Sequence, residues 1–85
     1  MNNQKRTNQG YKIIDSITVA DVELVIGHNP RSPDPYVCWY CKGSDYYYWG
    51  CYCNTLEAAQ RKLSERVDYK RRFKLHEYVS HDDAR

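Results

Sequence analysis

Apolar and polar residues alternate along two stretches near the start of the chain. The apolar positions that follow this spacing are Ile13, Ile17 and Val19 in the first stretch, and Val22, Leu24 and Ile26 in the second. A strand with one buried face has this period of two, because successive side chains point to opposite sides of a sheet. We predict antiparallel strands over residues 11–18 and 22–28, joined by a tight turn at Ala20–Asp21.

A second hairpin is predicted further along the chain. The segment from His28 to Pro35 contains all three prolines, and we predict a surface loop there because proline cannot donate a hydrogen bond to a sheet. Residues 36–42 and 46–53 are rich in residues that favour strands, and Gly43-Ser44-Asp45 between them is typical of a turn. Gly50, inside the second of these strands, indicates a bulge or a close approach of two backbones.

The pattern changes to a helical one after residue 53. Asn54 followed by Glu57 resembles a helix-capping pattern, with Asn54 as the N-cap. One apolar stripe follows at helical spacing, formed by Leu56, Ala59, Leu63 and Val67. The stripe does not continue past Val67. We predict a helix that either bends near residues 67–69 or projects beyond the sheet and docks its second half on another chain.

These elements predict an α+β fold, a four-stranded antiparallel meander (ββββα) with one C-terminal helix across one face. The 85 residues predict one small domain over residues 11–85, and the polar residues 1–10 predict a flexible arm. No run of about 18 apolar residues occurs, which excludes a membrane-spanning helix. Residues 1–10 also lack the apolar stretch of a signal peptide, so we expect a cytoplasmic protein with reduced cysteines.

Nine tyrosines and two tryptophans supply much of the apolar bulk of the chain, and most of them lie in the second predicted hairpin. Both faces of that hairpin must carry rings, whereas one helix covers only one face. We predict that the uncovered face binds a partner, because Tyr and Trp are enriched at binding hot spots and also stack on bases. The alternative is that the phenol groups only solvate an open face. The predicted aromatic binding residues are Tyr36, Tyr40, Tyr46, Tyr47, Tyr48, Trp49 and Tyr52.

The formal net charge is only +2, but basic residues are concentrated in the predicted helix. Such a block suits an anionic partner, either nucleic acid or an acidic protein surface, and the alternative is a solvated helix face. The predicted basic binding residues are Arg61, Lys62, Arg66, Lys70, Arg71, Arg72 and Lys74.

An apolar cluster follows on a rotated face of the same helix, beyond the length that a small sheet can cover. Its members are Tyr69, Phe73, Leu75, Tyr78 and Val79. Exposed apolar clusters usually mark interfaces, so we predict homodimerisation or docking on a target through residues 69–79, with the two-fold dimer favoured. The alternative is a bend that folds this segment back onto the open sheet face.

Four cysteines are candidates for a zinc site, which needs four thiolates that converge on one point. They are Cys38, Cys41, Cys51 and Cys53. On regular strands Cys38 and Cys41 point to opposite faces, so we predict ordinary half-buried thiols, with zinc as the minor alternative and no cofactor. The histidines do not lie beside a Ser or Cys at the spacing of a nucleophile and its base, and no glycine-rich phosphate loop occurs. We predict that the protein is not an enzyme.

Several segments resemble one group of proteins, the small accessory proteins carried by conjugative and transposon-like elements of Firmicutes. The segments are Tyr11 to Ser16, Val25-Ile26-Gly27, Pro35 to Trp39 and Tyr47-Tyr48-Trp49-Gly50. The resemblance covers about residues 11–66 and implies an accessory protein of a mobile element. Such proteins often block host defence systems, including CRISPR nucleases, by stoichiometric binding.

Three functions remain open on the sequence. The leading one is a non-enzymatic inhibitor of a host defence nuclease, resembling an anti-CRISPR protein, whose partner is a host protein such as a CRISPR effector nuclease. The alternative is a nucleic-acid-binding module that contacts phosphates with the basic helix and stacks bases on the aromatic face. The third is an accessory for assembly or transfer of the mobile element.

Overall fold

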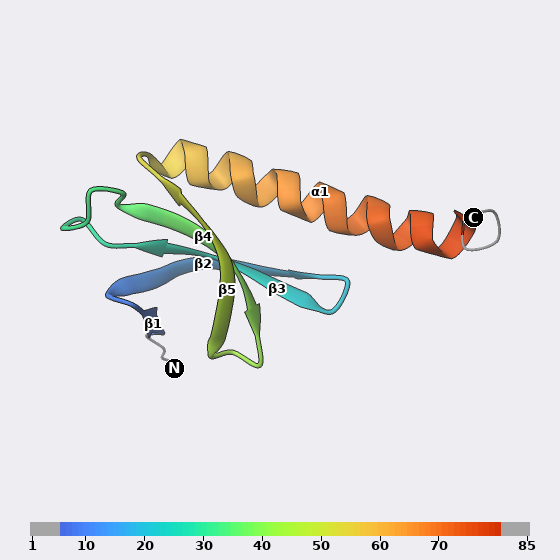
Figure 1. Ribbon diagram of the computed structural model, residues 1–85, viewed down its shortest axis with the longest axis horizontal. Coiled ribbons are helices and arrows are strands. Elements are labelled where there is room, and N and C mark those ends of the chain that lie inside the picture. The colour runs from blue at the N-terminus through green and yellow to red at the C-terminus, as the bar shows by residue number, and fades with distance from the viewer. Residues whose placement is uncertain (1–5, 81–85) are drawn as a thin grey trace.

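The computed structural model describes residues 6–80, and for residues 73–80 it describes the backbone alone. The chain forms an antiparallel sheet and one helix within this range (Figure 1). The elements are β1 (Thr7–Asn8), β2 (Tyr11–Val19), β3 (Val22–His28), β4 (Tyr36–Lys42), β5 (Tyr46–Cys53) and α1 (Leu56–Ser80). The strands lie in the sheet in the order in which they occur along the chain, so each connection joins neighbours.

The α+β class and the antiparallel sheet followed by a C-terminal helix are confirmed, but the predicted number of strands is wrong. The described part of the chain has five strands, because β1 pairs with β2 through Thr7 with Lys12 and Asn8 with Tyr11. This strand lies within the segment predicted to be a flexible arm. A strand of two residues has no detectable period, so its pairing depends on β2 rather than on its own sequence.

The connections follow the predicted turn chemistry. Ala20 and Asp21 have φ angles of 51° and 67°, which is the left-handed backbone that a two-residue hairpin turn requires between β2 and β3. The segment between β3 and β4 is a loop, closed by a 2.8 Å hydrogen bond from the Asn29 amide to the Pro35 carbonyl. The Tyr11 hydroxyl donates to the Asp34 carbonyl at 2.7 Å and so holds this loop against β2.

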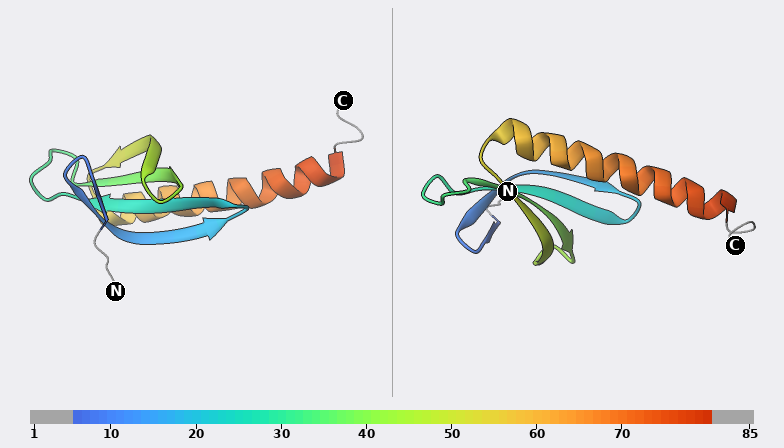
Figure 2. Two further views of the ribbon diagram at one scale, coloured as in Figure 1. Left: turned by 90° about the horizontal axis from the view of Figure 1, so that it is seen from below. Right: turned by 45° about the horizontal axis from the view of Figure 1, so that its top comes forward.

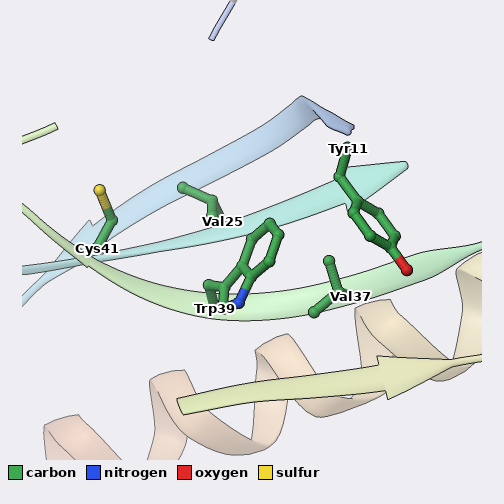
Figure 3. Close-up of a cluster of buried hydrophobic side chains, with 5 residues drawn as sticks. All are labelled: Tyr11, Val25, Val37, Trp39 and Cys41. Atoms are coloured by element: carbon green, nitrogen blue, oxygen red, sulfur yellow. The ribbon is translucent and has the colours of Figure 1, made fainter. Parts of the chain in front are cut away.

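Side chains pack on both sides of the curled sheet. The side away from α1 contains the cluster shown in Figure 3, in which Trp39 lies at the centre. Its buried members are Tyr11, Val25, Val37, Trp39 and Cys41. We call this side the concave side. A sheet with a core on both sides explains why β3 and β4 are buried along nearly their whole length.

The other side of the sheet is covered by α1 and is called the helix side (Figure 2). Leu24, Tyr40 and Val67 form its buried cluster, with Leu63 packed against them, so the predicted apolar stripe does face the sheet. The helix begins one residue later than the capping pattern indicated, because the Thr55 hydroxyl, not Asn54, accepts the Ala58 amide at 3.1 Å.

The helix α1 runs without interruption for 25 residues, about 37 Å at 1.5 Å per residue. Its C-terminal turns extend past the hairpin that joins β2 and β3 (Figures 1 and 2). Of the two predicted alternatives, the projecting helix is therefore the one that this fold contains, and residues 67–69 lie inside one continuous helix.

Candidate binding site

Trp49 is held in an unusual position on β5. Its side chain is 70% exposed, the largest exposed fraction among the large apolar side chains that the structure describes. Its φ angle is 52°, a left-handed conformation that costs a residue with a Cβ about 1–2 kcal/mol. The register between β4 and β5 shifts here, since Cys38 pairs with Cys51 and Tyr40 with Tyr48. One residue of β4 therefore faces two residues of β5, and this defines a bulge at Trp49 and Gly50.

The bulge results from the way Trp39 packs on the concave side. A Cβ atom placed on Gly50 would lie 2.7 Å from Nε1 of Trp39, and one placed on Gly27 would lie 3.1 Å from Cζ3 of the same ring. The indole thus lies against the backbones of both neighbouring strands, where no side chain fits. The bulge predicted at Gly50 is confirmed, and the close approach there is that of the Trp39 ring to the Gly50 backbone rather than that of two backbones.

Four aromatic rings gather on the helix side around the bulge. Tyr40 stacks on Tyr48 with ring centroids 5.5 Å apart, and Tyr46 also stacks on Tyr48 at 5.5 Å. The Trp49 ring makes T-shaped contacts with Tyr40 at 5.5 Å and with Tyr48 at 5.3 Å. We call these four residues the aromatic patch. Tyr40 is buried at its base, while Tyr46 and Trp49 are exposed at its outer side.

Two cations of α1 hold the helix against this patch. The Arg66 guanidinium carbon lies 4.7 Å from the centroid of the Tyr40 ring, and Lys70 Nζ lies 5.7 Å from it. Arg66 Nη1 also donates to the Cys38 carbonyl at 3.0 Å. Burial raises the pKa of Tyr40, so its phenol is neutral at physiological pH, and the two cations lie over the ring itself. Arg66 therefore has a structural role within the protein as well as its predicted role in binding.

The seven predicted aromatic residues do not form one face. Tyr40, Tyr46, Tyr48 and Trp49 form the patch, whereas the rings of Tyr47 and Tyr52 contact Trp39, at 5.5 Å and 6.3 Å, on the concave side. Tyr36 lies apart from the patch and stacks on His28 at 4.5 Å. The division follows from strand alternation together with the bulge, which places Tyr48 and Trp49 on the same side although they are adjacent in sequence.

The predicted basic residues are also divided. Arg66 and Lys70 border the patch, and Lys62 forms an ion pair with Glu65 at 3.0 Å. Three others, Arg61, Arg71 and Arg72, are exposed on α1.

The predicted docking cluster falls mostly outside the described side chains. Tyr69 is 60% exposed. The side chains of the remaining members, Phe73, Leu75, Tyr78 and Val79, and of the basic Lys74 lie outside the part of the chain whose side chains the structure describes.

The four cysteines lie on two sides of the sheet. Cys41 belongs to the concave cluster, whereas Cys38 and its strand partner Cys51 lie on the helix side with Cys53. Among the side chains that the structure describes, no group of three or more His, Cys, Asp or Glu residues is arranged to hold a metal ion. Burial raises the pKa of Cys38 to about 11, so its sulfur is a thiol at neutral pH. Burial also raises the pKa values of Cys41 and Cys53.

An ion pair that the sequence analysis missed joins the start of the chain to the middle of the sheet. Arg6 donates to both carboxylate oxygens of Glu23, at 3.1 and 2.6 Å, and to the Ser44 carbonyl at 3.3 Å. The hydrogen bond from Arg6 lowers the pKa of the Glu23 carboxyl. The two residues are 17 positions apart, so no local pattern in the sequence marks the pair.

Comparisons with known proteins gave no match: a scan against family models, a search of curated proteins and a search of solved structures each found none. The resemblance to mobile-element accessory proteins therefore stays a hypothesis. Within the described residues, no helix is both long and apolar enough to cross a membrane. The geometry of the aromatic patch is the best available basis for a functional assignment.

Proposed function

We propose that this chain is a non-enzymatic binding protein that acts by occupying the surface of a protein partner, with Trp49 as its anchor. The observation that carries the proposal is the exposed indole on a left-handed backbone. Strained conformations persist where the surrounding structure imposes them, and they cluster at functional sites. Tryptophan, tyrosine and arginine are the residues most enriched at binding hot spots, and the patch and its border contain all three.

The stacking within the patch favours a protein partner over single-stranded nucleic acid. Tyr48 stacks with both Tyr40 and Tyr46, so its ring is already engaged within the protein. Base-stacking platforms need free ring faces, whereas a protein hot spot needs a rigid aromatic anchor beside a well-packed support. Trp49 beside the tyrosine stack meets the second requirement.

The specific form that we propose is an inhibitor of a host defence nuclease, encoded by a mobile element, acting in the cytoplasm and resembling an anti-CRISPR protein. The motif resemblance supports this form. The state of the buried thiols agrees with binding rather than covalent catalysis, because catalytic cysteines need a lowered pKa and that of Cys38 is raised to about 11.

The test measures target-DNA cleavage by candidate CRISPR effector nucleases with and without the protein. We expect inhibition that saturates at a fixed molar ratio. Trp49→Asn should weaken inhibition by at least about 30-fold, the size of a hot-spot loss. Asn tolerates the left-handed backbone, so relief of strain offsets the lost ring contacts, and Tm should stay within about 5 °C of wild type.

The matched control is Ile14→Asn, which changes an exposed apolar residue on β2 and should keep full inhibition. If no nuclease is inhibited and no host protein co-purifies, the inhibitor proposal fails. If Trp49→Asn inhibits as well as wild type, Trp49 is not the anchor.

A second candidate function is nucleic-acid binding, and one observation favours it. Arg66 and Lys70 lie over Tyr40, and the exposed Trp49 packs against the same ring, so cations that could contact phosphates belong to the same cluster as a ring that could stack on a base. A gel shift with single-stranded and double-stranded oligonucleotides at two salt concentrations tests it. Binding at about micromolar concentration that weakens steeply with salt supports this candidate, and no binding at low salt excludes it.

A further inference from the structure

Cys38 and Cys51 face each other across β4 and β5. They are direct partners in the strand register and form the residue pair next to the bulge. Residues opposite each other in an antiparallel pair have Cα atoms about 4.5–5.5 Å apart. Disulfide bonds span Cα separations of about 4.4–6.8 Å, so the backbone already holds this pair at a distance that a disulfide can bridge.

The other two cysteines are less suitable partners for Cys51. Cys53 is on the same strand, two residues along, where Cβ atoms on one face are about 6.6 Å apart, beyond the usual separation in a disulfide. The Cys53 thiol donates to the Cys51 carbonyl at 3.6 Å, and it also lies beside the Cys51 thiol, which adds to burial in raising the pKa of Cys53. Cys41 is buried in the cluster on the concave side, with the sheet between it and Cys51. All four are free thiols in this structure.

Access differs between the two facing thiols. Cys38 is completely buried beneath α1, whereas Cys51 is only half-buried. An oxidant in solution therefore reaches Cys51 first. Cys38, its partner across the two strands, is the thiol that completes the bond. This pairing of an accessible thiol with a buried neighbour is the arrangement that thiol oxidation to an intramolecular disulfide needs.

We propose that Cys51 is an oxidation site for peroxides and that Cys38 resolves it as a reversible disulfide. In the first step the Cys51 sulfur attacks one peroxide oxygen, the O–O bond breaks, and hydrogen peroxide leaves one oxygen on sulfur as a sulfenic acid and releases one water. In the second step the Cys38 sulfur attacks the Cys51 sulfur and the S–S bond forms as the S–O bond breaks. The proton of the Cys38 thiol passes to the leaving sulfenic hydroxyl, which departs as a second water. Two thiols are thereby oxidised by two electrons and one peroxide is reduced to two waters.

The bond would close a loop that contains the hairpin turn, the bulge and the outer rings of the aromatic patch. A cross-link restricts the unfolded chain, so the oxidised protein should have a Tm higher than the reduced protein by about 5 °C or more. This inference does not depend on the proposed function, because its readouts are chemical and thermal.

The test treats the full chain with hydrogen peroxide and maps it without reduction. Trypsin cuts after Lys42, and chymotrypsin cuts after Trp39, Tyr40 and Tyr52, so the double digest separates all four cysteines. We expect the mass of the monomer to fall by about 2 Da and the digest to contain a disulfide-linked Cys38–Cys51 peptide. Dithiothreitol should reverse both changes fully. Cys41→Ser is the matched control and should keep the link.

A second variant tests the role of Cys38 by a readout other than the disulfide itself. Cys38→Ala removes the resolving thiol, so Cys51 should stop at the sulfenic acid and be labelled by dimedone. The proposal is overturned if the wild-type monomer keeps its mass, or if the mapped link joins Cys51 to Cys53, involves Cys41, or connects two chains.

Discussion

At the scale of single residues, the indole of Trp39 determines how β3, β4 and β5 pack. It lies against Gly27 and Gly50 on the two neighbouring strands, and at both positions a Cβ would approach it to 3.1 Å or less. The space for this ring requires glycine on β5, and the extra residue of the bulge carries Trp49 to the helix side. The packing of the buried Trp39 and the position of the exposed Trp49 thus both depend on Gly50.

This linkage predicts the effect of Gly50→Ala. The added methyl would overlap the edge of the Trp39 ring, and overpacking of this kind costs about 1–3 kcal/mol of folding free energy. Urea unfolding measures the change. Gly43→Ala is an unsuitable control because the φ angle of Gly43 is positive. Ala58→Gly, at a half-buried position on α1, serves for comparison, since helix propensity alone predicts a loss of about 1 kcal/mol of folding free energy there. A Gly50→Ala protein as stable as wild type would contradict the packing described here.

At the scale of elements, the Arg6–Glu23 pair ties the segment before β1 to β3. The pair is bidentate and partly buried, with side-chain exposures of 32% and 21%. Arg6 also reaches the carbonyl of Ser44 in the turn between β4 and β5. The shortest strand is therefore anchored by an ionic contact in addition to its backbone pairing with β2.

The lowered pKa of Glu23 predicts how stability depends on pH. A carboxyl with a folded pKa below its unfolded value, about 4.3, contributes stability above that pH and loses it as pH falls through the folded pKa. Glu23→Gln should therefore cost about 1–2 kcal/mol at pH 7, as for a charge-assisted hydrogen bond, and the gap from wild type should close below about pH 4.

Denaturant unfolding at a series of pH values measures this gap. The matched control is Glu65→Gln, which removes the exposed pair with Lys62 and should cost less than about 0.5 kcal/mol at any pH. A gap between wild type and Glu23→Gln that does not change between pH 7 and pH 3 would show that the loss comes from packing and not from the ion pair.

At the scale of the whole molecule, α1 is longer than the sheet that it covers. Its first half is held by Val67 and Leu63 against the sheet and by Arg66 at the bulge, while its last turns extend beyond the β2–β3 hairpin. Tyr69, in the second half of this helix, is 60% exposed. A helix that leaves its own domain in this way offers a surface to a second molecule.

We predict that the protein forms a two-fold dimer through residues 69–79. Light scattering should give twice the monomer mass for wild type, and the Phe73→Asp, Val79→Asp double variant should be monomeric. Ile14→Asp, which changes an exposed residue on β2, is the control and should remain dimeric. A monomeric wild type rules out self-association, and a double variant that remains dimeric places the interface elsewhere.

The positions of β2, β3, β4, β5 and the start of α1 could be predicted to within about one residue, because each depends on a local pattern. Alternation marks β2 and β3, aromatic and β-branched residues mark β4 and β5, and the stripe that ends at Val67 marks the covered part of α1. Gly50 was informative as well, since a glycine inside a strand signals a bulge or close approach.

The tertiary structure alone decided which of these residues lie together. The added strand β1 and its Arg6–Glu23 pair join segments 17 residues apart. Strand alternation together with the bulge between β4 and β5 decided on which side of the sheet each aromatic residue lies. Lys70 interrupts the apolar stripe in sequence, yet it lies over Tyr40 in the fold. Local sequence determines the period of an element because backbone geometry sets it. Contacts between elements depend on register and ring packing, which arise only when the sheet curls around Trp39 and closes under α1.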